Sequence, residues 1–235
     1  RDPDLKLNSS GDIKKTDQAS EMLPYPHESA TAHVTGSALY VDDVALPSNA
    51  LHVEVGVSEH ASARLKSVDL TKVRTSEGVV DVITSTDIPG ENEVGALLPG
   101  DRLLSSQLVE YVAQPIFAVA ALSLRQAQLA VAKAVIEYEI TEPTLDVDSA
   151  MAAKSFVTPS RRWGDGNIAS VIKESDHQVA NELYIRGQEH FYLEPQASFA
   201  SPRDDGMFVA TSSQHPGEVQ SAVAKVLGWP MHRVT

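Results

Sequence analysis

The sequence predicts an α+β protein with two folded parts that follow a polar N-terminal stretch. Two segments alternate apolar and polar residues, which is the period of half-buried strands, and a continuous apolar run precedes a capped helix. After Gly164 and Gly166 a second group of strands and a helix begins. A chain of 235 residues with 42% hydrophobic residues is long enough for one large or two modest domains.

Residues 1–30 are polar and show no sustained hydrophobic period. They contain Pro3, Pro24 and Pro26, which interrupt regular secondary structure. We therefore expect a tail or linker here, outside any folded core.

The first folded part is predicted to span residues 31–142. Residues 51–57 and 64–70 alternate apolar with polar, and residues 79–84 are β-branched and short. Residues 116–121 are continuously apolar, as in a strand that is buried on both faces.

A helix is predicted directly after this apolar run. Ser123 is suited to cap the first backbone donors, and Gln126 stands three residues on as the reciprocal cap. The apolar stripe expected on the helix consists of Leu124, Ala127, Val131 and Val135. Strands before and after a helix are typical of a mixed α and β domain.

Residues 143–165 are predicted to link the two parts, with a short helix at residues 147–153. The second part, residues 166–235, is predicted to contain strands at residues 179–185, 197–200 and 207–211. A helix at residues 217–227 is closed by Gly228. Residues 234–235 begin another strand, so we expect this domain to be incomplete.

The composition argues against several classes of protein. A net charge of −13 repels a nucleic-acid backbone or an anionic membrane. Without cysteine, the chain forms neither disulfides nor thiolate-ligated metal centres. The longest apolar run, residues 116–122, is far shorter than the ~20 residues that span a bilayer, and the N-terminus lacks a signal pattern. The expected location is the cytoplasm.

The short motifs of several enzyme classes are absent from the sequence. There is no G-x-S-x-G, no G-x-G-x-x-G, no P-loop and no H-E-x-x-H. His190 and Glu194 would share one face of a strand, but no third ligand has a suitable spacing, so direct metal ligation is not predicted. His52 and His60 flank a half-exposed strand and are expected to be solvated.

Two segments late in the chain carry the strongest functional signal. Residues 187–194 read GQEHFYLE and residues 212–216 read SSQHP, so uncharged amides stand beside apolar residues. Further segments in order are HESA at 27–30, HVTG at 33–36, ALYVDD at 38–43, IPG at 88–90 with Asn92, and YVAQP at 111–115. From about Pro24 to Thr235, these segments resemble the large, molybdenum-containing subunit of the xanthine dehydrogenase family.

The resemblance implies an α/β-hammerhead domain at residues 31–142, followed by a truncated molybdenum-cofactor-binding domain at residues 166–235. The whole protein would hydroxylate hypoxanthine or xanthine towards urate with a molybdopterin-molybdenum cofactor. Electrons would pass through iron-sulfur clusters and FAD on a smaller partner subunit to NAD.

Two alternatives to this function stay open. Within the family, the alternative is a molybdenum hydroxylase that acts on aldehydes or N-heterocycles. From another class comes a non-catalytic module that docks the redox subunit. In either case the chain by itself is expected to be inactive, to bind none of these cofactors and to self-associate.

The resemblance also implies roles for particular residues. Gln214 matches a glutamine whose amide donates to the apical oxo ligand of molybdenum, and a neutral donor orients an oxo group without burying a charge. The residues expected to form a buried polar network around the site are Gln188, Glu189, His190 and Glu194. No residue of this chain is predicted to ligate the metal directly or to act as the catalytic base.

Three positions depart from the family pattern. Arg186 replaces a glycine near Gln188, Pro195 replaces a small hydroxyl residue, and Ala113 replaces the glycine that usually precedes the Gln-Pro pair. Glycine permits backbone dihedrals that other residues disfavour, so the resemblance does not fix the conformation around Arg186.

Overall fold

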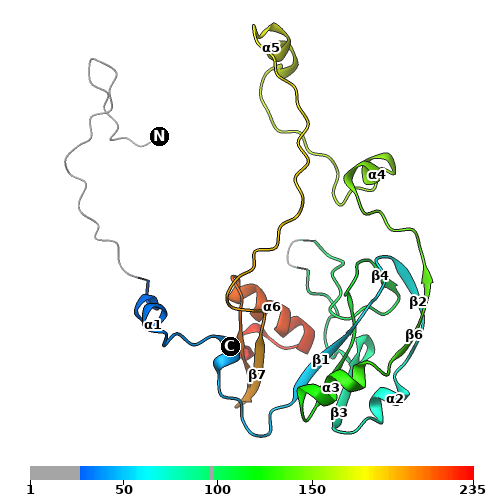
Figure 1. Cartoon of the computed structure of the whole chain (residues 1–235), viewed down its shortest axis with the longest axis vertical. Helices are drawn as coiled ribbons and strands as arrows, with labels where there is room; N and C mark the ends of the chain where they lie inside the picture. Colours follow the sequence, from blue (N-terminus) through cyan, green and yellow to red (C-terminus); the bar gives the residue numbers. More distant parts are fainter. Residues whose placement is uncertain (1–26, 96–97) are drawn as a thin grey trace, which may run out of the picture. The chain divides into compact units, whose positions relative to one another are not determined.

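The computed structural model describes residues 27–95 and 98–235 (Figure 1). The chain divides into two compact units, residues 1–44 and residues 45–235, and each is described by itself. Most of the expected tail, residues 1–30, lies outside the described residues.

The described part of the first unit holds two short helices. The helix α1 (Ala30–Thr35) ends at Gly36, whose φ of 72° lies in the left-handed region that glycine favours. The turn η1 (Val41–Asp43) follows, and the Asp43 carboxylate accepts a hydrogen bond from the backbone N–H of Tyr40 at 2.9 Å. This carboxylate satisfies a backbone donor that the short turn would otherwise leave free.

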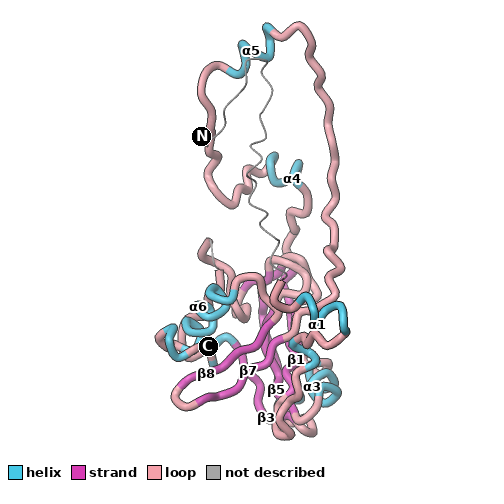
Figure 2. The backbone as a smooth tube through the Cα atoms, turned by 90° about the vertical axis from the view of Figure 1, so that its left-hand side faces the viewer, coloured by secondary structure: helices cyan, strands magenta, loops and turns pink. Residues whose placement is uncertain are grey.

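The second unit begins with a three-stranded antiparallel sheet in the order β1-β5-β3. Its strands are β1 (His52–Val57), β5 (Pro115–Ala121) and β3 (Val79–Thr84). Figure 2 shows the three strands side by side with α3 next to them. The central strand β5 buries Phe117 and Val119, which share one face, at 1% and 0% exposure. On its other face Ile116 is buried and Ala118 and Ala120 are half-buried, so the predicted burial of both faces is confirmed only in part.

A second three-stranded antiparallel sheet has the order β4-β2-β6. Its strands are β4 (Leu108–Val109), β2 (Ala63–Asp69) and β6 (Val135–Ile140). Side chains from both sheets and from the short helix α2 (Thr71–Arg74) enter one hydrophobic core. The turn η2 (Ser85–Asp87) follows β3 directly.

The helix α3 (Leu124–Val131) has the predicted cap but a different buried face. Ser123 Oγ accepts from the backbone N–H of Gln126 at 3.3 Å and donates to its side-chain oxygen at 2.9 Å. Ala127 and Ala130 are fully buried, whereas Leu124 is 47% exposed. The predicted stripe is therefore wrong in part, because the helix ends at Val131 and small alanines let it pack closely on the sheet.

Between β6 and β7 the chain forms only two short helices among the described residues (Figure 1). They are α4 (Val147–Ala152), which confirms a predicted helix, and α5 (Ile168–Glu174). Asp146 and Asn167 cap them by accepting from the backbone N–H groups of Ser149 and Ser170.

The predicted strand at residues 179–185 is wrong, because these residues form no ladder in the described chain. Val179 and Leu183 are 96% and 81% exposed. A strand needs a neighbour to take its backbone hydrogen bonds, and the described structure offers none at this segment.

The last elements of the chain agree with the predicted pattern. The hairpin of β7 (Ser198–Arg203) and β8 (Gly206–Thr211) is followed by the helix α6 (Pro216–Leu227). Gly228 ends this helix with a φ of 66°, as predicted. After η3 (Met231–Arg233), Val234 forms a parallel bridge to Met207, so the predicted final strand is present as a single bridge.

No helix in the described parts of the chain is long and apolar enough to cross a membrane.

Candidate functional site

The segment of residues 212–215 lies between the end of β8 and the start of α6. Ser212 fixes its first part, because the Ser212 hydroxyl donates to Pro195 O at 3.1 Å and accepts from the backbone N–H of Ala197 at 3.1 Å. The backbone N–H of Ser212 also donates to Ala197 O at 3.2 Å. These bonds tie the segment to the residues that precede β7.

The second part of the segment forms the N-terminal end of α6. His215 occupies the cap position and Pro216 the first turn, where a missing N–H costs nothing. His215 O accepts from the backbone N–H groups of Glu218 and Val219 at 3.0 and 3.1 Å. His215 N donates to Ser213 Oγ at 3.1 Å, so the backbone on both sides of Gln214 is held by local hydrogen bonds.

Gln214 is exposed and lines an open cavity of about 500 Å³. The cavity is also lined by Tyr192, Glu194, Gln196, Ser212 and Ser213. Gln214 and Glu194, which the sequence assigned to one site, are therefore brought to the same cavity. Gln196 joins them, and its amide donates to the Tyr192 hydroxyl at 3.0 Å.

The other predicted site residues do not line this cavity. Gln188, Glu189 and His190 are exposed in the coil that precedes β7. Glu194, which does line the cavity, is half-buried. The expected buried polar network is therefore not formed in the described chain. A polar network becomes buried only where other segments cover it, and no described segment covers this coil. The roles of these residues around a cofactor stay predictions.

The two backbone departures have different outcomes. Arg186 is not among the residues with positive φ, so arginine is tolerated there without strain. Ala113 has a φ of 69°, in the region that normally belongs to glycine. Phe191, within the GQEHFYLE segment, has a φ of 52°.

The donor set of the cavity suits hydrogen bonding to a neutral or oxo group better than metal ligation. Amides and hydroxyls from Gln214, Gln196 and Ser213 line it. Within residues 27–95 and 98–235, no group of three or more His, Asp or Glu side chains is placed to hold a metal ion. The residues present therefore fit a cofactor that brings its own metal and is held by hydrogen bonds.

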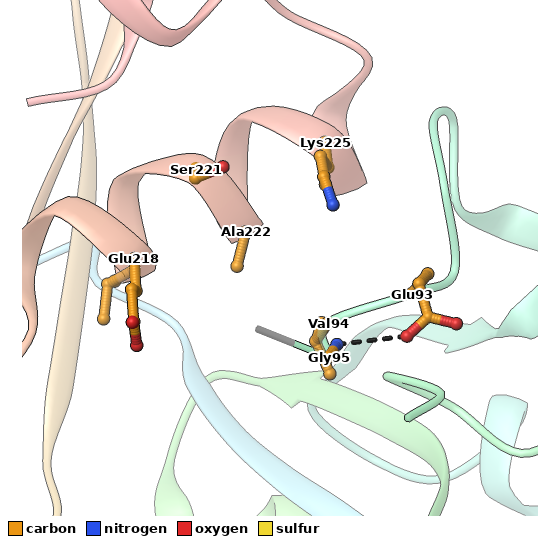
Figure 3. A pocket seen from close by; sticks show the side chains of 8 residues that line it. Glu93, Val94, Gly95, Glu218, Ser221, Ala222 and Lys225 are labelled. Atoms are coloured by element: carbon orange, nitrogen blue, oxygen red, sulfur yellow. Dashed lines mark hydrogen bonds between the residues drawn. The ribbon is translucent and has the colours of Figure 1, made fainter. Parts of the chain in front are cut away.

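A second cavity, which the sequence did not predict, lies between the loop after β3 and α6 (Figure 3). It measures about 320 Å³ and is lined by Glu93, Val94 and Gly95 on one side and by α6 residues on the other. Figure 3 shows the Lys225 side chain extending from α6 towards this loop. The sequence feature nearest to this cavity is the IPG segment at 88–90 with Asn92, which directly precedes the lining residue Glu93.

Glu93 organises the loop beside this cavity. Its carboxylate accepts from the backbone N–H groups of Gly100 at 2.9 Å and Gly95 at 3.0 Å. These two hydrogen bonds, helped by the positive charges of Arg102 and Lys225, hold the pKa of Glu93 below its usual value.

Two family models match the chain in succession. Residues 35–142 match the model described as "aldehyde oxidase and xanthine dehydrogenase, a/b hammerhead domain". Residues 151–235 match the model of the molybdopterin cofactor-binding domain.

Curated relatives carry both enzyme names. Aldehyde oxidase 2 of Macaca fascicularis is 36% identical over 215 residues, which is 90% of this chain and 16% of the relative. Xanthine dehydrogenase 1 of Arabidopsis thaliana is 36% identical over 213 residues, which is 88% of this chain and 16% of the relative. The chain thus spans about 16% of the length of these relatives.

Among solved structures, the aldehyde oxidoreductase from Desulfovibrio gigas matches with a TM-score of 0.77 and 22% sequence identity. The match covers 89% of this chain and 26% of that chain. At this identity the likeness concerns the fold alone. It agrees with the predicted order of a hammerhead domain followed by the start of a cofactor-binding domain.

Proposed function

Because the chain belongs to the aldehyde oxidase and xanthine dehydrogenase family, we propose that it is part of a molybdenum hydroxylase. The observation that carries the proposal is the succession of the two matches, a hammerhead domain at residues 35–142 and a molybdopterin cofactor-binding domain at residues 151–235. The segment of residues 212–215 then belongs to the wall of the cofactor site. The remaining wall would come from polypeptide outside this chain.

The proposed task of this chain is to orient the cofactor by hydrogen bonds. When bound, the molybdenum cofactor supplies the chemistry that places an oxygen atom from water on a carbon and takes up two electrons. The Gln214 amide is a neutral donor at the start of a helix, so it can face an oxo group without the cost of a buried charge. Gln188 is the second candidate amide, from the coil before β7.

We propose a purine, hypoxanthine or xanthine, as the substrate of the whole protein. The resemblance of several ordered segments to xanthine dehydrogenases supports this choice. Relatives named aldehyde oxidase at equal identity support an aldehyde or an N-heterocycle as the second candidate. We further propose that iron-sulfur clusters and FAD on a partner subunit or domain carry the electrons to NAD in the cytoplasm.

The test is made on the full-length protein co-expressed with its redox partner. Elemental analysis should find molybdenum, and pterin should be released on denaturation. Reduction of NAD is then followed with xanthine, with hypoxanthine and with an aromatic aldehyde. Turnover of the purines above the aldehyde supports the first substrate, and the reverse order supports the second. Protein that folds but holds neither molybdenum nor pterin would contradict the proposal and favour a docking module.

The two candidate amides are separated by paired substitutions in the molybdenum-loaded protein. Gln214→Glu places an anion towards an electron-rich oxygen, so turnover per bound molybdenum should fall by roughly 100-fold if the amide supplies the ~3 kcal/mol typical of a preorganised donor. Gln188→Glu should then have a milder effect. The opposite pattern, a normal Gln214→Glu and an inactive Gln188→Glu, would assign the donor to Gln188.

A further inference from the structure

The C-terminal end of α6 is closed by donors from two different parts of the chain. The last carbonyls of any α-helix lack partners within the helix. In α6, Trp229 N and Gly228 N donate to the carbonyls of Ala224 and Lys225 at 2.9 and 3.1 Å. This is the local closure that a C-terminal glycine permits.

Two further donors come from the loop after β3, more than a hundred residues earlier in the sequence. Gly90 N donates to Val226 O at 2.9 Å, and Glu91 N donates to Lys225 O at 2.9 Å. Lys225 O thus accepts two hydrogen bonds, one from Gly228 N of its own helix end and one from Glu91 N of the loop. A loop of the hammerhead domain therefore completes the hydrogen bonding of a helix in the cofactor-binding domain.

Gly90 makes this contact sterically feasible. A Cβ atom at residue 90 would overlap the carbonyl oxygen of Lys225 and the backbone nitrogen of Gly228. Gly90 does not have a positive φ, so its conformation is open to other residues. Glycine is required here by the close approach of two backbones and by nothing else.

The loop that carries Gly90 is itself fixed to the hammerhead domain. The Asn92 side chain donates to Leu104 O at 2.7 Å and accepts from Leu104 N at 2.9 Å. The Glu93 carboxylate closes the next turn through Gly95 and Gly100. The donors of Gly90 and Glu91 are therefore presented by a preformed loop.

We propose that Gly90 is a positioning residue: the loop of residues 88–93 clamps the end of α6 and thereby sets the placement of the segment before α6. The helix has 12 residues, so its two ends lie about 18 Å apart and move as one body. His215 O is bonded to the first turn of that helix, so Gln214 follows any displacement of α6. The consequence for the cofactor rests on the proposed function, whereas the clamp itself does not.

Loss of the clamp should leave α6 folded, because the helix has other attachments. Gln220 donates through its amide to Val234 O at 2.6 Å and to Met231 O at 3.2 Å. Ala224 is buried at 2% exposure. The clamp is therefore expected to set the orientation of the helix without being needed for its formation.

The test is hydrogen exchange of the 235-residue chain with Gly90→Ala. The control is Gly217→Ala. Gly217 lies on α6, has open space where a new Cβ would stand and lacks a positive φ. In Gly90→Ala the amides of residues 90 and 91 lose their acceptor carbonyls on α6 and should exchange at least about tenfold faster, since each lost hydrogen bond corresponds to roughly that factor. The amides inside α6 should keep their protection, because the helix stays folded. Residues 115–121 should keep their protection. Equal exchange in both variants would overturn the clamp.

A second variant covers the case in which Gly90→Ala unfolds the sheet as well. Asn92→Ala adds no bulk and only releases the loop from Leu104, so it should speed exchange at residues 90 and 91 by a smaller factor in the same direction. No change there would overturn the proposal. In the full-length protein, Gly90→Ala should also lower the bound molybdenum per chain. If the wild-type protein binds no molybdenum, the proposed function fails while the exchange result still decides the clamp.

Discussion

Ala113 holds a backbone conformation that costs an alanine free energy. Its φ is 69°, and the turn is fixed by Ala113 N donating to Ser58 O at 2.8 Å and by Ser58 N donating to Gln114 O at 2.9 Å. An L-residue in the left-handed region costs roughly 1 kcal/mol, which glycine does not incur. Ala113→Gly should therefore raise the free energy of unfolding by about 0.5 to 1 kcal/mol, measured by urea denaturation.

A matched control for this prediction is Ala132→Gly. Ala132 ends α3 with a φ of −64°, which suits alanine. Glycine at this position relieves no strain and only raises the conformational entropy of the unfolded chain. This variant should therefore lower the free energy of unfolding by about 0.5 to 1 kcal/mol. If both variants lower the free energy of unfolding, glycine does not relieve backbone strain at Ala113.

The structural roles of single residues are predictable from the sequence where a local rule applies. The sequence has Ala113 where the family pattern has glycine, and the structure gives this residue the conformation that glycine favours. Ser123 acts as a cap because its partner lies three residues away. The placement of Gln188, Glu189 and His190 was not predictable in this way, because burial of a coil depends on distant segments that cover it.

At the scale of elements, β5 is the strand on which the first sheet depends. The Phe117 ring packs against Gly56 of β1 so closely that a Cβ at residue 56 would overlap it. Phe117→Ala leaves a cavity at a site with 1% exposure and should lower the free energy of unfolding by ~3 kcal/mol or more. His52→Ala, at a half-buried strand position, should do little. Equal shifts in melting temperature would mean that the core lies elsewhere.

The loop closed by Glu93 should respond to pH in a defined direction. Hydrogen bonds from Gly100 and Gly95 lower the pKa of Glu93 in the folded chain. A group with a lowered folded pKa stabilises fully above its unfolded value, near 4.3, and the contribution is lost as pH falls through the folded pKa. Glu93→Gln should therefore melt lower than wild type at pH 7, and the difference should shrink as the pH falls below about 4. A pH-independent difference would contradict this.

Elements were predictable where local pattern and pairing agree. The hairpin of β7 and β8 has Asp204, with a φ of 49°, and Gly206 at its turn, so both strands find a partner nearby. Residues 179–185 show a similar pattern but have no neighbour, and the strand does not form. The contact of Gly90 with α6 joins residues far apart in sequence. It could not be predicted, because no periodic pattern in the sequence indicates it.

At the scale of the whole chain, we expect the exposed apolar side chains of the coil before β7 to promote self-association. Val179, Leu183 and Leu193 are 96%, 81% and 82% exposed. The apolar side chains of α6 are less important for association, because Val219 and Val223 are half-buried. Exposed apolar surface tends to find a partner, and in a pure sample the available partner is a second copy.

The purified 235-residue chain should therefore self-associate, with a weight-average mass that rises with concentration in light scattering. Replacing Val179, Leu183 and Leu193 together by serine should lower that mass towards the monomer. Val80→Ser is the matched control, because Val80 is 55% exposed on a paired strand and not on the coil. A strict monomer at all concentrations, or a triple variant that associates like the wild type, would show that this coil does not form the contact between copies. The coil's apolar side chains would then have to be satisfied within one chain, which would appear as slow hydrogen exchange across residues 176–197.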